Sequence, residues 1–322
     1  MRKYLRPVLL VFTAVAAVLA TSFAPPAPAR AATTAKYDHI YLVVMENHSY
    51  SQIVGSSSAP YINKTLIANN AVATNYSNAR DLSVYNYMAL TAGQTFYGTG
   101  ANTVYDGCTP GGPVSNSRSC NINGPKNIVT EIGQSGRTWR AYEETMPVPC
   151  SNGASYGSTS TGGRYAAKHD PFPYFQDIRT NATLCKNYEP YTRLATDLSN
   201  NTVPNFAFVT PNLCSDGHDT CGGSAVGHSD QFLSKSLPAI FNSSSWKTSN
   251  SLLILTWDEG SGTSSKHVLW VGIRSQNSRG HVSSATAWNH YSTLRTIEDS
   301  WSLAPLTSND ASATNMSALL GS

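Results

Sequence analysis

Apolar runs and amphipathic segments alternate along most of the chain. Five short runs at residues 40–45, 138–142, 205–210, 252–257 and 268–273 are typical of strands that are buried on both faces. Helical patterns occur between them, at residues 60–69, 234–241 and 291–301. Strands that alternate with helices predict an α/β fold, with a mostly parallel sheet covered by helices on both faces.

Two long segments interrupt this pattern. Residues about 99–127 and 147–175 are rich in Gly, Ser, Asn and Pro and contain several of the six cysteines. Loops of this length are usually functional or tied down covalently. We therefore expect loop insertions that are pinned by disulfides and cap one end of the sheet, within a single domain.

The cysteine spacing indicates disulfides rather than a structural zinc site, because no C-x-x-C pair is present. Six cysteines allow 15 pairings. Two pairs flank short Gly-rich loops, and a sequential scheme then gives Cys108–Cys120, Cys150–Cys185 and Cys214–Cys221.

The N-terminal segment has the pattern of a secretory signal peptide. Basic residues precede an apolar run at 8–20, and Ala29-Arg-Ala31 is a cleavage site of the A-x-A type. We expect residues 1–31 to be a signal peptide, residues 32–322 to form one domain, and the mature protein to be secreted. No transmembrane segment is expected, since no later run approaches the roughly 20 apolar residues of a spanning helix.

The net charge does not indicate nucleic-acid binding. The chain has 22 Lys+Arg and 19 Asp+Glu, formally +3. Four of the basic residues lie in the leader, which leaves 18 basic and 19 acidic residues, a net charge of −1. No basic block is present, so we expect no nucleic-acid partner. The sequence does not indicate the oligomeric state.

Two of the apolar runs end abruptly in acidic residues. Glu46 and Asn47 follow the first run, and Asp258 and Glu259 follow the fourth. The carboxyl ends of parallel strands share one edge of a sheet, where ligands bind. Carboxylates that are brought together repel one another unless a cation lies among them, and oxygen ligands suit hard divalent ions. This pattern predicts one or two divalent metal ions. Alternatively, the acids simply begin solvated loops.

Ser83 stands before a short helical run that stops at Gly93. A serine in this position is often only an N-cap. The same position directs a hydroxyl and free backbone N–H groups toward a bound phosphate, and a metal ion can activate the hydroxyl as a nucleophile. Both interpretations stay open at this point.

Several histidines lie in polar segments, and two of these, His169 and His218, are next to an aspartate. His169, His218 and His290 are candidates for contacts to an anion, although a lone histidine in a loop is usually a surface or turn residue. His228 lies ahead of another predicted helix, and we expect Asp230 to be the N-cap of that helix.

These motifs together resemble a known family. They occur in the order Glu46-Asn-His-Ser49, Asp81-Leu-Ser-Val-Tyr-Asn-Tyr87, Lys168-His-Asp-Pro-Phe172, Asp216-Gly-His-Asp219, Thr256-Trp-Asp-Glu259 and Asn289-His-Tyr-Ser-Thr-Leu-Arg-Thr-Ile-Glu-Asp299. Over about residues 37–305 the chain resembles the bacterial phosphoesterases that include secreted acid phosphatases and phospholipases C, within the alkaline-phosphatase superfamily. The resemblance implies a doubly wound α/β fold. It also implies metal ligands at Glu46, Asn47, Ser83, Asp258 and Glu259, a nucleophile at Ser83, and phosphate-contacting or acid–base residues at His169, His218 and His290.

The segment around Ser83 departs from the family pattern. Acid phosphatases of this family usually have His-Pro-Ser-x-Pro-Asn-Tyr, whereas this chain has Asp81-Leu-Ser-Val-Tyr-Asn-Tyr87. The substrate therefore stays open between a small phosphomonoester, cleaved through a phosphoserine, and a phospholipid headgroup cleaved as a diester. A third alternative is a secreted protein that binds a metal or ligand without turnover.

Overall fold

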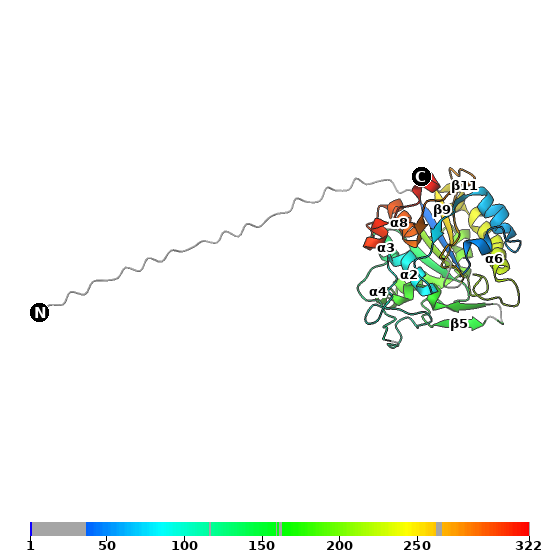
Figure 1. Ribbon diagram of the computed structural model, residues 1–322. Coiled ribbons are helices and arrows are strands. Elements are labelled where there is room, and N and C mark those ends of the chain that lie inside the picture. The colour runs from blue at the N-terminus through cyan, green and yellow to red at the C-terminus, as the bar shows by residue number, and fades with distance from the viewer. Residues whose placement is uncertain (2–36, 116, 159, 161–162, 262–265, 322) are drawn as a thin grey trace. The chain divides into compact units, whose positions relative to one another are not determined.

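The apolar runs form the central strands of an eight-stranded sheet in the computed structural model, which describes residues 1, 37–115, 117–158, 160, 163–261 and 266–321 (Figure 1). The sheet order is β11-β2-β10-β9-β1-β8-β4-β7. The strands are β1 (His39–Met45), β2 (Ala71–Ala73), β4 (Trp139–Glu143), β7 (Tyr188–Pro190), β8 (Phe206–Thr210), β9 (Ser251–Trp257), β10 (Trp270–Arg274) and β11 (Val282–Ser284).

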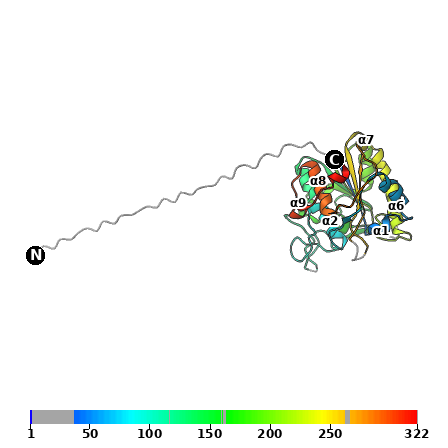
Figure 2. The same cartoon turned by 45° about the horizontal axis from the view of Figure 1, so that its top comes forward.

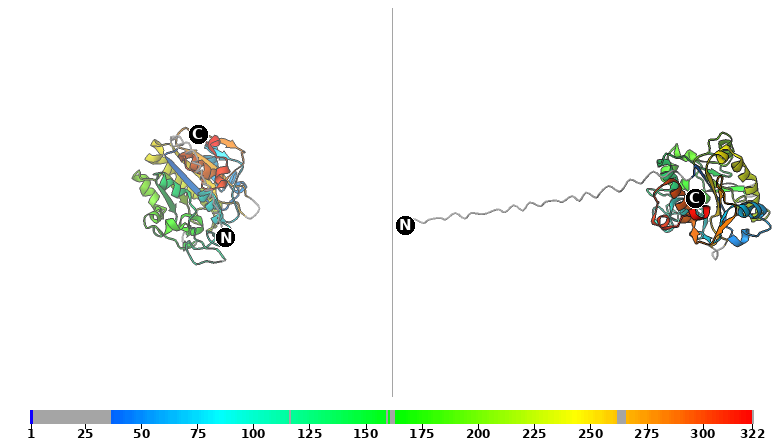
Figure 3. Two further views of the ribbon diagram at one scale, coloured as in Figure 1. Left: turned by 90° about the vertical axis from the view of Figure 1, so that its left-hand side faces the viewer. Right: turned by 90° about the horizontal axis from the view of Figure 1, so that it is seen from above.

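The sheet is mostly parallel, as predicted. Among its strands only β10 runs antiparallel to its neighbours, β9 and β2. The strands β1 and β9 lie side by side near the middle (Figure 3), and every residue of β9 is buried. Burial on both faces explains why these strands read as continuous apolar runs rather than alternating ones.

Helices cover both faces of the sheet. On one side lie α2 (Ser83–Ala92), α3 (Ile128–Gln134) and α8 (His290–Trp301), and on the other lie α1 (Tyr50–Ile53), α6 (Ala225–Asn242) and α7 (Ser244–Thr248) (Figures 1 and 2). The remaining helical elements are η1 (Ile62–Ile67), η3 (Ala167–His169), η4 (Phe172–Tyr174), α4 (Gln176–Arg179), η5 (Leu184–Asn187), α5 (Thr192–Ser199), α9 (Ser308–Ser312) and α10 (Ser317–Leu320). The predicted mixed α/β architecture is confirmed.

The helix α6 begins earlier than the sequence pattern predicted. Its N-cap is Ser224, whose side chain accepts a hydrogen bond from the Gly227 N–H. The expectation that Asp230 is the N-cap was wrong. Asp230 lies inside the helix, as does His228, and its carboxylate accepts a 2.8 Å hydrogen bond from the Ile62 N–H. The sequence alone could not indicate this tertiary contact.

The two Gly- and Ser-rich insertions are tied down covalently and to each other. The disulfides Cys108–Cys120, Cys150–Cys185 and Cys214–Cys221 are formed, which confirms the sequential pairing. Ile122 of the first insertion pairs with Phe175 of the second in an isolated parallel bridge. The second insertion also contains the hairpin of β5 (Ser155–Ser158) and β6 (Gly163–Ala166), and the pair β3 (Tyr76–Ser77) and β12 (Trp288–Asn289) forms another small sheet.

Thr33–Ser322 form one compact unit. The predicted signal peptide, residues 1–31, lies outside the described residues apart from Met1. Among the helices in the described part of the chain, none has the length and apolar character needed to span a bilayer.

Candidate active site

The carboxyl ends of β1 and β9 bring the two predicted acidic motifs together. Met45 is opposite Trp257 in the parallel ladder, and the Asp258 N–H donates a 2.9 Å hydrogen bond to the Met45 carbonyl. Glu46 and Asp258 therefore leave adjacent strands at the same edge of the sheet. Both side chains are fully buried.

Burial strongly perturbs these acids. It raises the pKa of Glu46 to about 8, with Lys168 acting in the opposite direction, and it raises the pKa of Glu259 to about 7. The pKa of Asp258 is raised well above its ordinary value by burial and then by the neighbouring Glu46 and Glu259. Neither carboxylate oxygen of Asp258 has a hydrogen-bond partner among the described residues. An unpaired buried carboxylate is costly, and a cation would relieve that cost.

Ser83 is the first residue of α2, not its N-cap as the simpler interpretation required. The N-cap is Leu82, whose φ of 76° and ψ of 130° are rare for a residue with a side chain. The Leu82 N–H donates to Glu259 Oε2 at 2.5 Å, and Ser83 Oγ donates to Glu46 Oε2 at 2.9 Å. Strained backbone of this kind is concentrated at functional sites. The Leu82 conformation and these two hydrogen bonds place Ser83 Oγ beside the acidic cluster.

His169 enters the site from η3, in the second insertion. Its Nε2 lies 3.1 Å from Glu46 Oε1 and its Nδ1 lies 3.3 Å from Asp216 Oδ2. The ring stacks on Tyr87 of α2, with centroids 5.2 Å apart. Burial lowers the pKa of His169 well below its ordinary value, so the ring is neutral near pH 7.

His218 lies at the more exposed side of the same cluster. Its Nδ1 is 2.7 Å from Asp219 Oδ1, and its Nε2 is 3.3 Å from Lys168 Nζ. The side chain is 26% exposed, in contrast to the buried rings of His169 and His290. Solvent and substrate can therefore reach His218 more readily than the other two predicted histidines.

Both ring nitrogens of His290, at the start of α8, are hydrogen-bonded to other groups of the protein. Its Nε2 lies 2.5 Å from the Asp258 carbonyl, which can only accept, so Nε2 carries the proton. Its Nδ1 then accepts from the Tyr76 hydroxyl at 3.0 Å. Burial lowers the pKa of His290 to about 4. This geometry fixes the backbone of Asp258 rather than directing a ring nitrogen at a substrate.

The loop after β8 depends on one glycine. Gly217 has a φ of +99°, and a Cβ there would lie 2.4 Å from Ser229 Oγ and 3.3 Å from His48 Cδ2. Only glycine fits this position without strain. The close approach lets the Asp216 carbonyl accept a 3.0 Å hydrogen bond from the Glu46 N–H, which ties the loop to the end of β1.

The sequence profile of the Phosphoesterase family matches residues 59–304. The chain belongs to the Phosphoesterase family. It is 31% identical over 271 residues to a phosphatidylinositol-3-phosphatase of Mycobacterium tuberculosis, an alignment that covers 83% of this chain and 78% of the relative. This family membership makes the protein a phosphoester hydrolase, as the sequence predicted.

Fungal relatives are longer than this chain. A probable acid phosphatase of Kluyveromyces lactis is 26% identical over 284 residues (87% of this chain, 62% of the relative). An acid phosphatase of Aspergillus fumigatus is 26% identical over 293 residues (89% of this chain, 60% of the relative). The chain thus spans about three-fifths of the length of these two fungal relatives.

The solved structures support the fold assignment. An alkaline phosphatase superfamily protein from Vibrio parahaemolyticus superposes with a TM-score of 0.58 at 13% identity, over 88% of this chain and 71% of that chain. The phosphonate monoester hydrolase of Silicibacter pomeroyi gives a TM-score of 0.52 at 8% identity, over 88% and 76% respectively. At these identities the similarity establishes only the fold.

The chemistry of this candidate site fits a divalent cation. Glu46, His169 and Asp216 form a buried cluster that could hold a metal ion, because a ligand atom from each lies within 4.8 Å of the others. In addition, Glu46 Oε1 and His169 Nε2 make no hydrogen bond within the described part of the chain, despite their short separation. By the same criterion Asp258 adds two more carboxylate oxygens without a partner among the described residues. The predicted ligand Asn47 follows Glu46 and is partly exposed.

Sequence reasoning missed three residues of this candidate site. Asp216 was part of a recognised motif, yet only His218 in that motif was assigned a role. Lys168 stands beside a predicted histidine, and its pKa is raised because Glu46 and Asp106 outweigh the opposing effect of burial. The motif Lys-His-Asp-Pro-Phe was the available signal for Lys168. Asp106 had no sequence signal, since it lies in an irregular loop.

We predict that the metal-free protein becomes less stable as pH rises from 6.5 to 8. The pKa values of Glu46 and Glu259 are raised to about 8 and about 7, so the folded state binds more protons than the unfolded state in this window. The free energy of unfolding must then fall with rising pH. Urea denaturation after chelation measures this slope. A saturating divalent ion should abolish this pH dependence of stability. A slope that is the same with and without metal would contradict the idea that Glu46 and Glu259 lie at the metal site.

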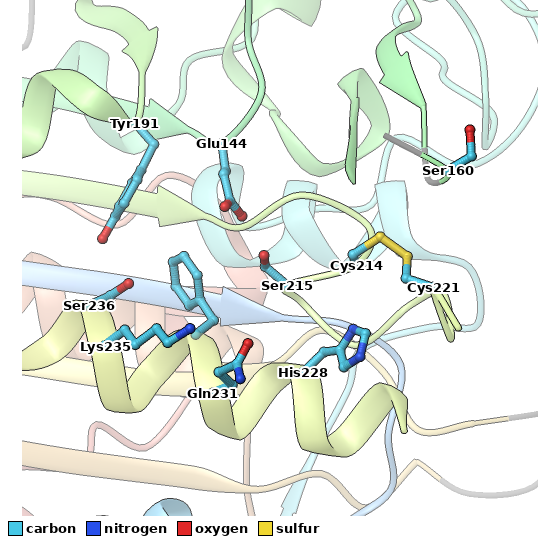
Figure 4. Close-up of a pocket in the computed structure, with 11 residues that line it drawn as sticks. Glu144, Ser160, Tyr191, Cys214, Ser215, Cys221, His228, Gln231, Lys235 and Ser236 are labelled. Carbon is cyan, nitrogen blue, oxygen red and sulfur yellow. A yellow bond between two sulfur atoms is a disulfide. The ribbon is translucent and has the colours of Figure 1, made fainter. Parts of the chain in front are cut away.

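A cavity of about 490 Å³ adjoins the loop that carries Asp216 (Figure 4). It lies between Tyr191 on one side and His228 and Lys235 of α6 on the other, beside the disulfide Cys214–Cys221. None of the residues that line it belongs to the predicted site. The cluster of Glu46, Ser83 and Asp258 therefore lies at the sheet edge, outside this cavity.

Proposed function

We propose that the protein is a secreted, metal-dependent phosphatase that hydrolyses phosphomonoesters through a phosphoserine on Ser83. The observation that supports this most directly is the position of the Ser83 hydroxyl. It lies at the N-terminus of α2, 2.9 Å from Glu46 Oε2, within a cluster of buried and incompletely paired carboxylates. The names of the relatives, phosphatidylinositol-3-phosphatase and acid phosphatase, favour a monoester over a diester.

The cation would be held by Glu46, Asn47, Asp258 and Glu259, with Ser83 as a further ligand. When bound, it would lower the pKa of the Ser83 hydroxyl and neutralise charge on the phosphoryl oxygens. The amides at the start of α2 favour the approach of an anion in the same direction. Lys168 supplies a fixed positive charge at the outer side of the cluster.

In the proposed first step, Ser83 Oγ forms a bond to phosphorus as the bond from phosphorus to the leaving oxygen breaks. The Ser83 proton passes to Glu46, which already accepts its hydrogen bond. His218 is the most exposed of the three predicted histidines. It protonates the leaving oxygen in its imidazolium form, in which the Nε2–H turns away from Lys168 Nζ because neither group can accept from the other. In the second step the oxygen of a water molecule forms a bond to phosphorus as the bond from phosphorus to Ser83 Oγ breaks. The water gives a proton to His218, and Glu46 returns its proton to Ser83 Oγ. His169 lies between Glu46 and Asp216, and His290 holds the backbone carbonyl of Asp258.

The substrate class can be tested with two chromogenic esters. We expect kcat/KM for p-nitrophenyl phosphate to exceed that for p-nitrophenylphosphorylcholine by about a hundredfold or more, because a site built for a terminal phosphoryl group leaves polar groups unpaired with a diester. Chelation should abolish both activities. A faster rate on the diester would favour the phospholipase C alternative.

A third substrate tests whether the enzyme recognises a phosphomonoester on a small molecule or one on a lipid headgroup. Water-soluble, short-chain phosphatidylinositol 3-phosphate carries the same phosphomonoester on a larger headgroup. If kcat/KM for it exceeds the value for p-nitrophenyl phosphate, the headgroup contributes to binding. Comparable or lower values would indicate that only the phosphoryl group is recognised.

A further inference from the structure

The carboxylate of Asp106 occupies a set of donors that suits a phosphoryl oxygen. The Val84 N–H, in the first turn of α2, donates to Asp106 Oδ1 at 3.4 Å. Lys168 Nζ lies 3.3 Å from Asp106 Oδ2. A helix N-terminal amide together with an ammonium group is a recurring combination in phosphate binding. Here that combination is filled by a side chain from the first insertion.

The surroundings of these donors point to a ligand in addition to Asp106. The helix α2 begins at Ser83, whose hydroxyl contacts the carboxylate cluster. The fully buried Asp258 in that cluster has both carboxylate oxygens unpartnered among the described residues. Lys168 Nζ also lies 3.3 Å from His218 Nε2, so it stands between Asp106 and the candidate general acid. The charge of this ammonium also acts on Glu46, the carboxylate that accepts the hydrogen bond from Ser83 Oγ.

The carboxylate of Asp106 lies where it can move away from the Val84 N–H and Lys168 Nζ. Its side chain is 25% exposed, whereas Glu46 and Asp258 are fully buried. Both of its contacts to the site are longer than a typical charge-assisted hydrogen bond. The loop around it is anchored next in the chain by the Cys108–Cys120 disulfide, which limits how far the carboxylate can move. A partly solvated side chain loses little when it swings outward.

We propose that Asp106 is an internal competitor for the phosphoryl group, which displaces its carboxylate from the Val84 N–H and Lys168 Nζ on binding. This inference rests on the proposed function. Its consequence is that Asp106 weakens the binding of phosphate, including the inorganic phosphate released by the reaction. Residue 106 therefore tunes product release as well as substrate affinity.

The test measures inorganic phosphate binding directly. The dissociation constant comes from isothermal titration of the metal-loaded protein, and the inhibition constant comes from p-nitrophenyl phosphate hydrolysis. We expect Asp106→Asn to bind phosphate on the order of tenfold more tightly, since it removes a competing charge within hydrogen-bonding range of Lys168. KM should fall in parallel. The matched control Asp177→Asn makes the same charge change at an exposed site in α4 and should leave both constants unchanged.

Weaker or unchanged phosphate binding in Asp106→Asn would indicate a different role for Asp106. If Asp106 instead positions Lys168, phosphate binding weakens or stays unchanged in Asp106→Asn, and the proposal is overturned while hydrolysis still supports the proposed function. Asp106→Glu provides a second variant that retains the charge and should bind phosphate no more tightly than the wild-type protein. A wild-type protein that neither hydrolyses p-nitrophenyl phosphate nor binds phosphate would overturn both proposals.

Discussion

Replacing Ser83 with alanine is expected to reduce phosphomonoester hydrolysis by at least about a thousandfold while the fold stays intact. Among the described residues the side chain makes one hydrogen bond, to Glu46, and the proposed metal ligands contributed by other residues remain in place. Removal of the hydroxyl therefore eliminates the covalent route without dismantling the site. The measurement is the steady-state rate on p-nitrophenyl phosphate, with circular dichroism to verify folding.

A purely structural role for Ser83 predicts something different. Loss of one buried hydrogen bond costs about 1 kcal/mol of stability and leaves turnover nearly normal. Ser245→Ala is a suitable control, because Ser245 is also buried but lies in α7. We expect the control to retain wild-type activity. A Ser83→Ala protein that retains it as well would end the covalent mechanism.

Asp258→Asn is expected to abolish metal binding and activity without destabilising the metal-free protein. In the wild-type protein Asp258 is buried beside Glu46, and neither of its oxygens has a hydrogen-bond partner in the part of the chain that the structure describes. A neutral amide of the same shape removes repulsion among the acids. The metal-free variant should thus unfold at the same temperature as the metal-free wild-type protein or at a higher one.

The addition of metal then distinguishes the wild-type protein from the Asp258→Asn variant. At a metal concentration of 100 times the dissociation constant, binding stabilises the wild-type protein by about 2.7 kcal/mol, which raises Tm by roughly 5 °C or more. The variant should show no such rise, and elemental analysis should find no bound ion. Asp230→Asn is the control, since Asp230 is buried outside the site and its replacement can still accept from the Ile62 N–H. An equal metal-induced rise in Tm for Asp258→Asn would contradict its role as a ligand.

The parts of the fold that the sequence predicted share one physical cause. The strands β1 and β9 are buried on both faces, so their apolar runs are continuous and end where the chain reaches the site. Glu46 and Asp258 are recognisable because they break those runs abruptly. We expected Glu46 and Asp258 to lie close together because parallel strands end at the same edge of a sheet. The register, with Met45 opposite Trp257, confirms this.

The parts that could not be predicted depend on contacts between distant segments. Asp216 reaches Glu46 because Gly217 allows the loop after β8 to pack closely, and no local pattern encodes this approach. Asp106 and Lys168 meet only because two irregular insertions fold against each other. Likewise, the sequence marked His290 as a candidate acid, but its bonds to Asp258 and Tyr76 appear only in three dimensions.

The central claim is that phosphate is transferred to Ser83 during turnover. The most direct measurement is mass spectrometry of protein quenched in acid during steady-state hydrolysis of p-nitrophenyl phosphate. We predict an added phosphate on the peptide that contains Ser83, present with substrate and absent from the Ser83→Ala protein. Full hydrolytic activity with no phosphate on that peptide, in a quench fast enough to capture the steady state, would contradict the account.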